Sequence, residues 1–239
     1  GTTVLDQLVL AGPSVLGVTQ DPNTGLIYAL QLFDRTFEVI SWDGTAYTSE
    51  GSVTFDPDFT SIPSTDGPPF ASGLSYDNVN GTLWIMVAQD NAGAGFTMHE
   101  VNLDGSPTGN TISDPAFGGL AADVEHDAVT DTFWFVDIVA DQVHNYTRAG
   151  TELGSVPQSC LDDGSGVFGN GCDISNGVLE VLVGTLVEPT ADRAVPISQI
   201  DGSTLGDCPF ACDSVTDIDP DVTTSTFQSS ICRDRNDPS

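Results

Sequence analysis

An internal repeat constrains the fold of this chain more than any other feature of its sequence. Each copy begins with an acid, continues with about three turn residues and then Gly or Asp, and ends in an apolar run. The four copies are Asp21–Tyr28, Asp77–Trp84, Asp127–Trp134 and Asp173–Glu180. Their first acids follow one another at intervals of 56, 50 and 46 residues. A period of about 50 residues predicts one small structural unit that is repeated along the chain.

A second turn signal recurs in phase with the first. It is Asp-Gly in three copies and Ala-Gly in the other, at Trp42–Thr45, Leu103–Ser106, Arg148–Thr151 and Ile200–Ser203. Asp-Gly between β-type runs is typical of a hairpin, because a type I′ turn needs positive φ at both central residues. The two signals divide each repeat into four short strands, so the sequence predicts an all-β fold: a small β-propeller of four to five four-stranded blades. A β-sandwich, the competing all-β fold, has no reason to repeat its turns in phase.

The first two copies carry a longer cadence, Gly-x-x-x-Asp-x-x-x-Gly followed by apolar residues and Tyr or Trp, over Gly17–Tyr28 and Gly73–Trp84. In this cadence the chain resembles the broad group of secreted YVTN- and NHL-like β-propellers, over residues from about 15 to 206. The later copies depart from it, with Asp123 in place of the leading glycine and Glu180 in place of the aromatic residue. The resemblance implies a fold and no particular function, because such propellers serve many purposes.

The repeats predict a single domain over residues 1–239. Its blades are expected at 12–56, 70–113, 117–157 and 168–206, with a fifth from 213–232 plus 1–11. The degenerate copy near Asp219 has too few residues for a full blade, and the N-terminal run is surplus to the four complete repeats. Pairing of these two ends within one chain closes a monomer. Pairing between copies is the alternative, self-association through terminal strands.

The charge balance excludes several classes of partner. The chain has 35 acidic and 5 basic residues, all arginine, for a net charge of -30. Nucleic acid is excluded as a partner, because it requires a basic surface that neutralises phosphates. No apolar run approaches the roughly 20 residues of a membrane-spanning helix, so no membrane insertion is expected. The acids are spread between the apolar runs and predict an acidic coat on a folded body.

This charge predicts that salt stabilises the protein. Thirty uncompensated negative charges repel one another, and salt screens such repulsion over a Debye length of about 10 Å at 0.1 M ionic strength. The melting temperature should rise as salt or calcium is added, which differential scanning calorimetry measures directly. A melting temperature that stays constant from low to high ionic strength would contradict this prediction.

The cysteines and sequons favour an extracellular, secreted protein. The spacing of Cys208 and Cys212 is not that of a zinc or redox motif, so disulfides are expected, between Cys160 and Cys172 and between Cys232 and either Cys208 or Cys212. One of the five cysteines is left over. Disulfides persist in oxidising compartments, and a start at Gly without an initiator Met fits a mature secreted product. The sequons at Asn80 and Asn145 predict a glycoprotein.

Acidic residues suggest two kinds of cation site. The series Asp217, Asp219, Asp221 has the spacing that opens a calcium loop. An EF-hand is excluded, because Val222 and Gln228 stand where its glycine and glutamate belong, so the expected cofactor is calcium in a looser site. The acids that open the repeats could form a ring around a cation, although we favour a local role in each turn. These acids are Asp21, Asp77, Asp127, Asp173 and, in the degenerate copy, Asp219.

The histidines and repeat aromatics are weaker candidates. His99 and His144 share one slot of the repeat, and with His126 they complete the histidines of the chain. We expect strand positions for them in preference to catalytic or metal roles. For the aromatic residues of the repeats we favour packing between blades over a sugar-binding platform. These residues are Tyr28, Trp84 and Trp134.

The sequence contains no recognisable catalytic motif, neither a nucleophile elbow nor a phosphate-binding loop. We therefore expect a non-enzymatic extracellular β-propeller that acts as a binding or structural module in adhesion or surface assembly, with a glycan or protein as ligand. The alternative is a metal-dependent propeller hydrolase or lyase with a divalent ion on its axis.

Overall fold

Fifteen β-strands form the part of the chain that the computed structural model describes, residues 15–31, 35–55, 70–88, 95–140, 142–157, 167–175, 178–185 and 193–197. They form four antiparallel sheets, three with four strands and one with three. No helix in these residues is long and apolar enough to cross a membrane. The prediction of an all-β fold is confirmed.

The sheets follow the sequence repeat, with strands in chain order within each sheet. The first contains β1 (Val15–Gln20), β2 (Ile27–Gln31), β3 (Thr36–Trp42) and β4 (Tyr47–Thr54). The second contains β5 (Phe70–Asp77), β6 (Thr82–Ala88), β7 (Phe96–Val101) and β8 (Pro107–Asp114). The third contains β9 (Ala121–Asp127), β10 (Thr132–Asp137), β11 (Gln142–Thr147) and β12 (Glu152–Pro157). The fourth contains β13 (Val167–Ser175), β14 (Val178–Thr185) and β15 (Arg193–Ile197).

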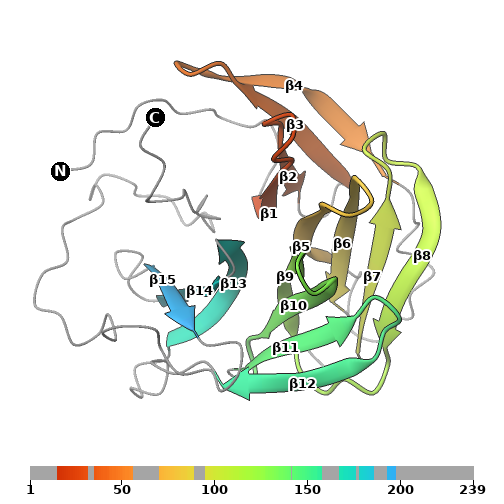
Figure 1. Ribbon diagram of the computed structural model, residues 1–239, viewed down its shortest axis with the longest axis vertical. Coiled ribbons are helices and arrows are strands. Elements are labelled where there is room, and N and C mark those ends of the chain that lie inside the picture. The colour runs from red at the N-terminus through yellow and green to blue at the C-terminus, as the bar shows by residue number, and fades with distance from the viewer. Residues whose placement is uncertain are drawn as a thin grey trace, which may run out of the picture.

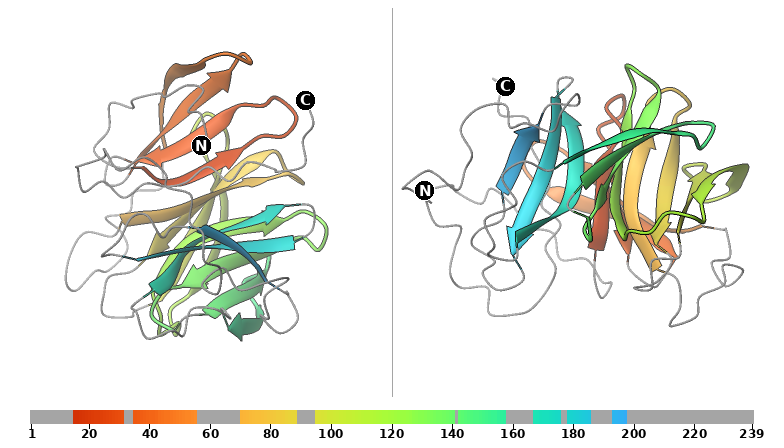
Figure 2. Two further views of the ribbon diagram at one scale, coloured as in Figure 1. Left: turned by 90° about the vertical axis from the view of Figure 1, so that its left-hand side faces the viewer. Right: turned by 90° about the horizontal axis from the view of Figure 1, so that it is seen from below.

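The sheets surround a common centre, with β1, β5, β9 and β13 innermost and β4, β8 and β12 at the periphery (Figure 1). Figure 2 shows the same sheets from two further sides, face against face. This is the arrangement of blades in a β-propeller-like fold. The second strand of each four-stranded sheet is buried on both faces, which explains its nearly continuous apolar sequence.

Apolar clusters hold neighbouring sheets together. The aromatic residues of the repeats take part in all three interfaces: Tyr28 packs toward the second sheet, Trp84 toward the third and Trp134 toward the fourth. All three are at most 5% exposed. The interpretation of these residues as packing between blades is confirmed.

The inner strands approach one another closely at a β-bulge. A Cβ on Gly17 of β1 would lie 2.8 Å from the backbone nitrogen of Leu74 in β5. A Cβ on Gly73 would lie 2.7 Å from the Cα of Asp123 in β9. The register of both β1 and β5 shifts at the glycine, so the bulge lies at the same place in the two sheets. Glycine leads the cadence because the next sheet leaves no room for a side chain.

Hydroxyl groups join the inner strands two residues further along. The backbone N–H of Tyr76 donates to the Thr19 Oγ1 at 3.0 Å, and that of His126 donates to the Ser75 Oγ at 2.8 Å. Thr19 and Ser75 each stand two residues before the first acid of their repeat. The repeat therefore specifies contacts between sheets as well as turns within them.

The fourth repeat is out of register with the others. In the second and third sheets the repeat acid pairs with the first residue of the next strand, as Asp77 does with Thr82. In the fourth sheet Asp173 pairs instead with Glu180, and the hairpin closes between Ser175 and Val178. Asp173 therefore matches Ser75, and the prediction that it is equivalent to Asp77 is wrong. The acid and the last residue of the consensus are seven positions apart in every copy, and this equal spacing concealed the difference in the hairpins. The loop of the fourth sheet is two residues shorter than that of the second.

The outer strand of each four-stranded sheet carries an irregularity that protects its edge. The register of β3 with β4, β7 with β8 and β11 with β12 shifts near the middle of the pair. A glycine with positive φ lies at each shift: Gly51 at 124°, Gly109 at 91° and Gly154 at 152°. Such bulges hinder an edge strand from pairing with a strand of another chain. The outer edges of the first three sheets are therefore poorly suited to strand addition.

Candidate functional site

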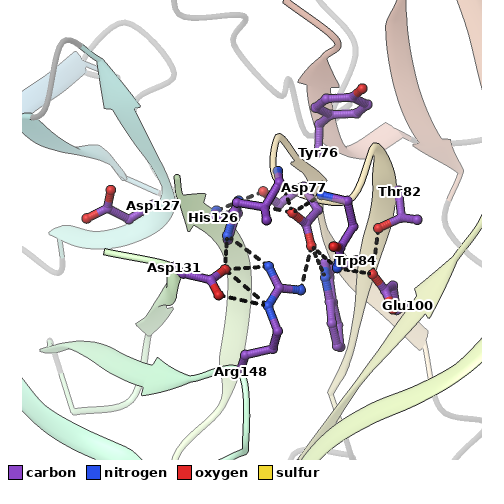
Figure 3. Close-up of polar contacts among 12 residues, drawn as sticks. Tyr76, Asp77, Thr82, Trp84, Glu100, His126, Asp127, Asp131 and Arg148 are labelled. Carbon is purple, nitrogen blue, oxygen red and sulfur yellow. Dashed lines mark hydrogen bonds and ion pairs between the residues drawn. The ribbon is translucent and has the colours of Figure 1, made fainter. Parts of the chain in front are cut away.

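A polar cluster lies between the second and third sheets, at the end where the first hairpins turn (Figure 3). Asp77 ends β5, and Trp84 lies in β6 of the same sheet. His126 lies in β9 of the third sheet, Asp131 in the turn after β9, and Arg148 directly after β11. Five side chains from the turns and strands of two repeats thus meet at one interface.

Arg148 is the centre of this cluster. Its Nη1 donates to the Asp77 Oδ2 at 2.6 Å, and its Nε donates to the Asp131 Oδ1 at 3.1 Å. Its Nη2 lies 2.5 Å from the Asp131 Oδ1 and 3.3 Å from the His126 Nε2. The guanidinium carbon also lies 6.0 Å from the ring centre of Trp84 and 5.5 Å from that of Phe133, within range of a cation–π interaction. One arginine therefore joins two sheets through charge, hydrogen bonds and ring contacts.

Asp77 is ionised within this cluster although its side chain is fully buried. Burial alone raises the pKa of Asp77, but hydrogen bonds from Arg148, from the Asn80 backbone and from the Trp84 indole lower it to about 2. Burial lowers the pKa of Arg148, and the two carboxylates more than offset this. His126 has no exposed side-chain surface. The charged groups of this cluster form hydrogen bonds and ion pairs with one another, so the cluster stabilises the contact between the two sheets.

The first and third interfaces have different residues at the positions equivalent to His126 and Arg148. At the first interface Tyr76 occupies the position of His126 and bonds to Asp21, while Leu103 occupies the position of Arg148 and packs on the apolar cluster. At the third interface Ile174 occupies the position of His126, because Asp173 in the fourth sheet is equivalent to Glu125 in the third. The first acid of the repeat, Asp21, Asp77 or Asp127, is thus present at each of the three interfaces, while the residue that faces it from the next sheet changes. An ion pair with arginine occurs at the interface between the second and third sheets.

The repeat acids also close their own turns. Each accepts the N–H of the residue two positions further on: Asp21 from Asn23, Asp77 from Val79 and Asp127 from Val129, all at 2.9 Å. The fifth residue of each turn has positive φ, at Gly25, Gly81 and Asp131, which explains why the consensus requires Gly or Asp there. The interpretation of these acids as turn residues is confirmed for the first three copies. Asp219 lies outside the described residues.

Two buried glutamates were missed from the sequence. Glu100 in β7 is 3% exposed, and its carboxylate accepts hydrogen bonds from four neutral side chains, those of Asn80, Thr82, Thr108 and Asn110. Glu38 in β3 accepts from Ser49 and Ser52 of β4. The Ser- and Thr-rich outer strands are the sequence signal, since their hydroxyls replace water around an acid on the neighbouring strand.

The shared histidine slot holds His144 between two acids. Its Nδ1 lies 2.9 Å from the Glu152 Oε1, and its Nε2 lies 3.7 Å from the Asp137 Oδ2. The imidazole is stacked on Phe135 and meets the edge of Phe117. Burial lowers the pKa of His144, but the hydrogen bonds and charges of Asp137 and Glu152 outweigh it and raise the pKa above its usual value.

Replacing His144 with Gln should cost stability in acid and little in alkali. A raised pKa means that the charged imidazole stabilises the folded state below the unfolded pKa of about 6.5, and that this contribution is lost as pH rises through the folded pKa. We expect a loss of about 1–2 kcal/mol near pH 5.5 that shrinks by about pH 8.5. Urea unfolding of both proteins at the two pH values measures it. A loss that is equal at both would assign His144 a packing role only.

The remaining candidate residues divide between described and undescribed parts of the chain. Cys172 is buried in β13, with its Sγ 3.5 Å from the Trp134 carbonyl oxygen. The other predicted disulfide and calcium residues lie outside the described residues: Cys160, Cys208, Cys212, Cys232, Asp217, Asp219 and Asp221. In the described strands and turns, no three His, Cys, Asp or Glu side chains form a group suited to a metal ion. The disulfide and calcium assignments stay predictions.

No protein-family model and no curated protein sequence matches this chain. Among solved structures it is similar to a protein of unknown function from Bacteroides caccae, with a TM-score of 0.50 and 12% identity over 80% of this chain and 59% of that one. The hydrazine synthase of Kuenenia stuttgartiensis matches with a TM-score of 0.49 and 11% identity over 86% and 52%. A nidogen/laminin complex matches with 0.42 and 16% over 78% and 65%.

This chain spans less than two thirds of the length of each of these structures. At 12% identity the likeness to the first of these structures shows the fold alone, and the arrangement of the sheets is that of a β-propeller-like protein. It does not support the YVTN or NHL groups specifically.

Proposed function

We propose that this protein is a non-enzymatic extracellular β-propeller that serves as a binding or structural module. The supporting observation is the use of ionisable side chains inside the described sheets. The acids of the first three repeats close turns, Arg148 and His126 join two sheets, and Glu100 is surrounded by neutral donors. Because these ionisable side chains form hydrogen bonds and ion pairs within the fold, they stabilise the blades, and the rigid blades present their loops to a partner.

We propose five blades, because one face of the first sheet lacks a partner sheet among the described strands. Tyr28 and Leu30 of β2 pack toward the second sheet, so the alternating Ile27 and Ala29 face the other way. Ile27 and Ala29 are 6% and 2% exposed, and they cluster only with residues of their own sheet in the described part. The close packing between consecutive inner strands does not recur between β13 and β1 among the described strands. Residues 3–11 paired with 214–231 would supply the missing blade.

The acidic coat and the protected rim suggest how a partner would bind. A net charge of -30 favours a partner with a basic surface, or a glycan or protein surface bridged by calcium. The bulged outer strands disfavour binding by strand addition, so we place the binding surface on the loop faces. Secretion, calcium at Asp217, Asp219 and Asp221, and the two disulfides belong to this proposal.

The test compares binding with turnover on one preparation of the full chain. Glycan and secreted-protein arrays are probed with the protein in calcium and in EDTA, at low and high salt. Chromogenic esters and glycosides and a set of uronic-acid polysaccharides are incubated with the protein after loading with calcium, zinc or manganese. We expect saturable binding that weakens with salt, and no metal-dependent turnover. Turnover that requires a divalent ion would overturn the proposal in favour of a metal-dependent hydrolase or lyase.

A further inference from the structure

The two sequons lie in very different places in the fold. Asn80 is exposed at the tip of the turn between β5 and β6, two residues before β6 begins. Asn145 lies inside β11, where its backbone pairs with Trp134 on one side and Gly154 on the other. The sequence motif is the same at both sites, so only the fold distinguishes them as acceptors.

The Asn80 side chain can carry a substituent without leaving its place. Its Nδ2 donates to the Glu100 Oε1 at 3.1 Å and to the Asp77 Oδ2 at 3.3 Å. An N-linked nitrogen retains one hydrogen, so one of these bonds can persist after modification. The backbone N–H of Asn80 donates independently to the Asp77 Oδ1 at 3.0 Å and would be unaffected. Its neighbour Val79 is 56% exposed, which places the turn tip in solvent.

The Asn145 side chain is half-buried and lies on a face of the third sheet that packs against the fourth. Residues opposite one another in a sheet lie on the same face, so Asn145 shares the face of Trp134. Trp134 packs in one cluster with Cys172 and Leu179 of the fourth sheet. The Oδ1 of Asn145 is itself buried. A glycan on this residue would therefore enter the interface between the third and fourth sheets.

We infer that Asn80 carries an N-linked glycan in the folded protein and that Asn145 does not, an assignment that rests on the proposed extracellular route. The hydroxyl of Thr82, which completes the first sequon, is buried and donates to the Glu100 Oε1 at 2.7 Å. Transfer to Asn80 must therefore precede closure of the turn. Transfer to Asn145 would prevent the two sheets from packing, so chains modified there are absent from the folded product. The glycan on Asn80 covers the hairpin end of the second sheet, beside the Arg148 cluster.

The test expresses the full chain with a secretion signal in a cell line that performs N-glycosylation. The monomeric secreted fraction is treated with peptide N-glycosidase in ¹⁸O water and mapped by mass spectrometry. We expect the ¹⁸O label at Asn80 and none at Asn145. Asn80→Gln should abolish the enzyme-sensitive mobility shift, and the matched Asn145→Gln should leave it unchanged.

A label at Asn145, or an unmodified Asn80, overturns the inference. Mapping of the unsubstituted chain decides this even if Asn80→Gln fails to fold. A secreted protein that binds partners on the arrays while Asn80 is unmodified would leave the proposed function intact. Retention of the chain inside the cell would instead count against the extracellular route as well.

Discussion

Deletion of residues 1–11 is expected to unfold or aggregate the protein, because we propose that this segment helps to cover the free face of the first sheet. Ile27 and Ile40 are buried on that face. Moving an isoleucine side chain from a core to water costs about 1.5–3 kcal/mol, so exposing both costs roughly 3–6 kcal/mol. Whole domains are stable by only about 5–15 kcal/mol. The melting temperature and the sedimentation coefficient of the truncated protein measure the effect.

Two controls separate the role of this sequence from that of chain length. A chain with residues 1–11 replaced by a Gly/Ser segment of equal length should behave like the deletion. A synthetic peptide of residues 1–11, added in trans, should restore part of the lost stability. If the intact protein proves to be a filament, the deletion should instead release subunits, which would support pairing between copies. An unchanged melting temperature and assembly state would exclude both forms of closure.

Replacing Arg148 with Leu is expected to destabilise the protein by about 3 kcal/mol, because it leaves a buried carboxylate without its cation. The Asp77 side chain has no exposed surface, whereas that of Asp131 is 47% exposed. The matched control Asp131→Asn should therefore cost less than 1 kcal/mol, as is usual for an exposed ion pair (about 0–1 kcal/mol). Urea unfolding of the three proteins measures the difference.

A double substitution tests whether the charge on Asp77 is the cause. In Arg148→Leu, the further change Asp77→Asn should recover part of the loss, since a neutral amide is less costly to bury than an unpaired charge. The pH dependence provides a second test. The pKa of about 2 for Asp77 means that its ion pair stabilises the folded state above the unfolded pKa, and that this contribution is lost as pH falls toward that value. The deficit of Arg148→Leu should therefore shrink below about pH 4. A deficit that is independent of pH would assign Arg148 a packing role.

The strands and turns of this protein could be predicted from the sequence because their causes are local. A turn that needs positive φ admits Gly25 and Gly81 readily, and an acid such as Asp21 accepts the N–H groups within its own turn. These requirements recur in the first three repeats and can be read without knowledge of the neighbouring sheets. The same logic failed at Asp173, because spacing along the chain does not report hairpin register.

The polar cluster could not be predicted, because its members come from separate turns and its charges are paired across an interface. Asp77 and Arg148 are 71 residues apart, and no local rule distinguishes Arg148 from Leu103, which occupies the equivalent position one repeat earlier. The sequence by itself determined the repeat, the strands and the turn chemistry, since these depend on backbone conformation and short-range hydrogen bonds. Tertiary structure alone decided which acid is paired, which histidine has a raised pKa and which sequon lies at an exposed turn, because burial and electrostatic partners are properties of the packed sheets.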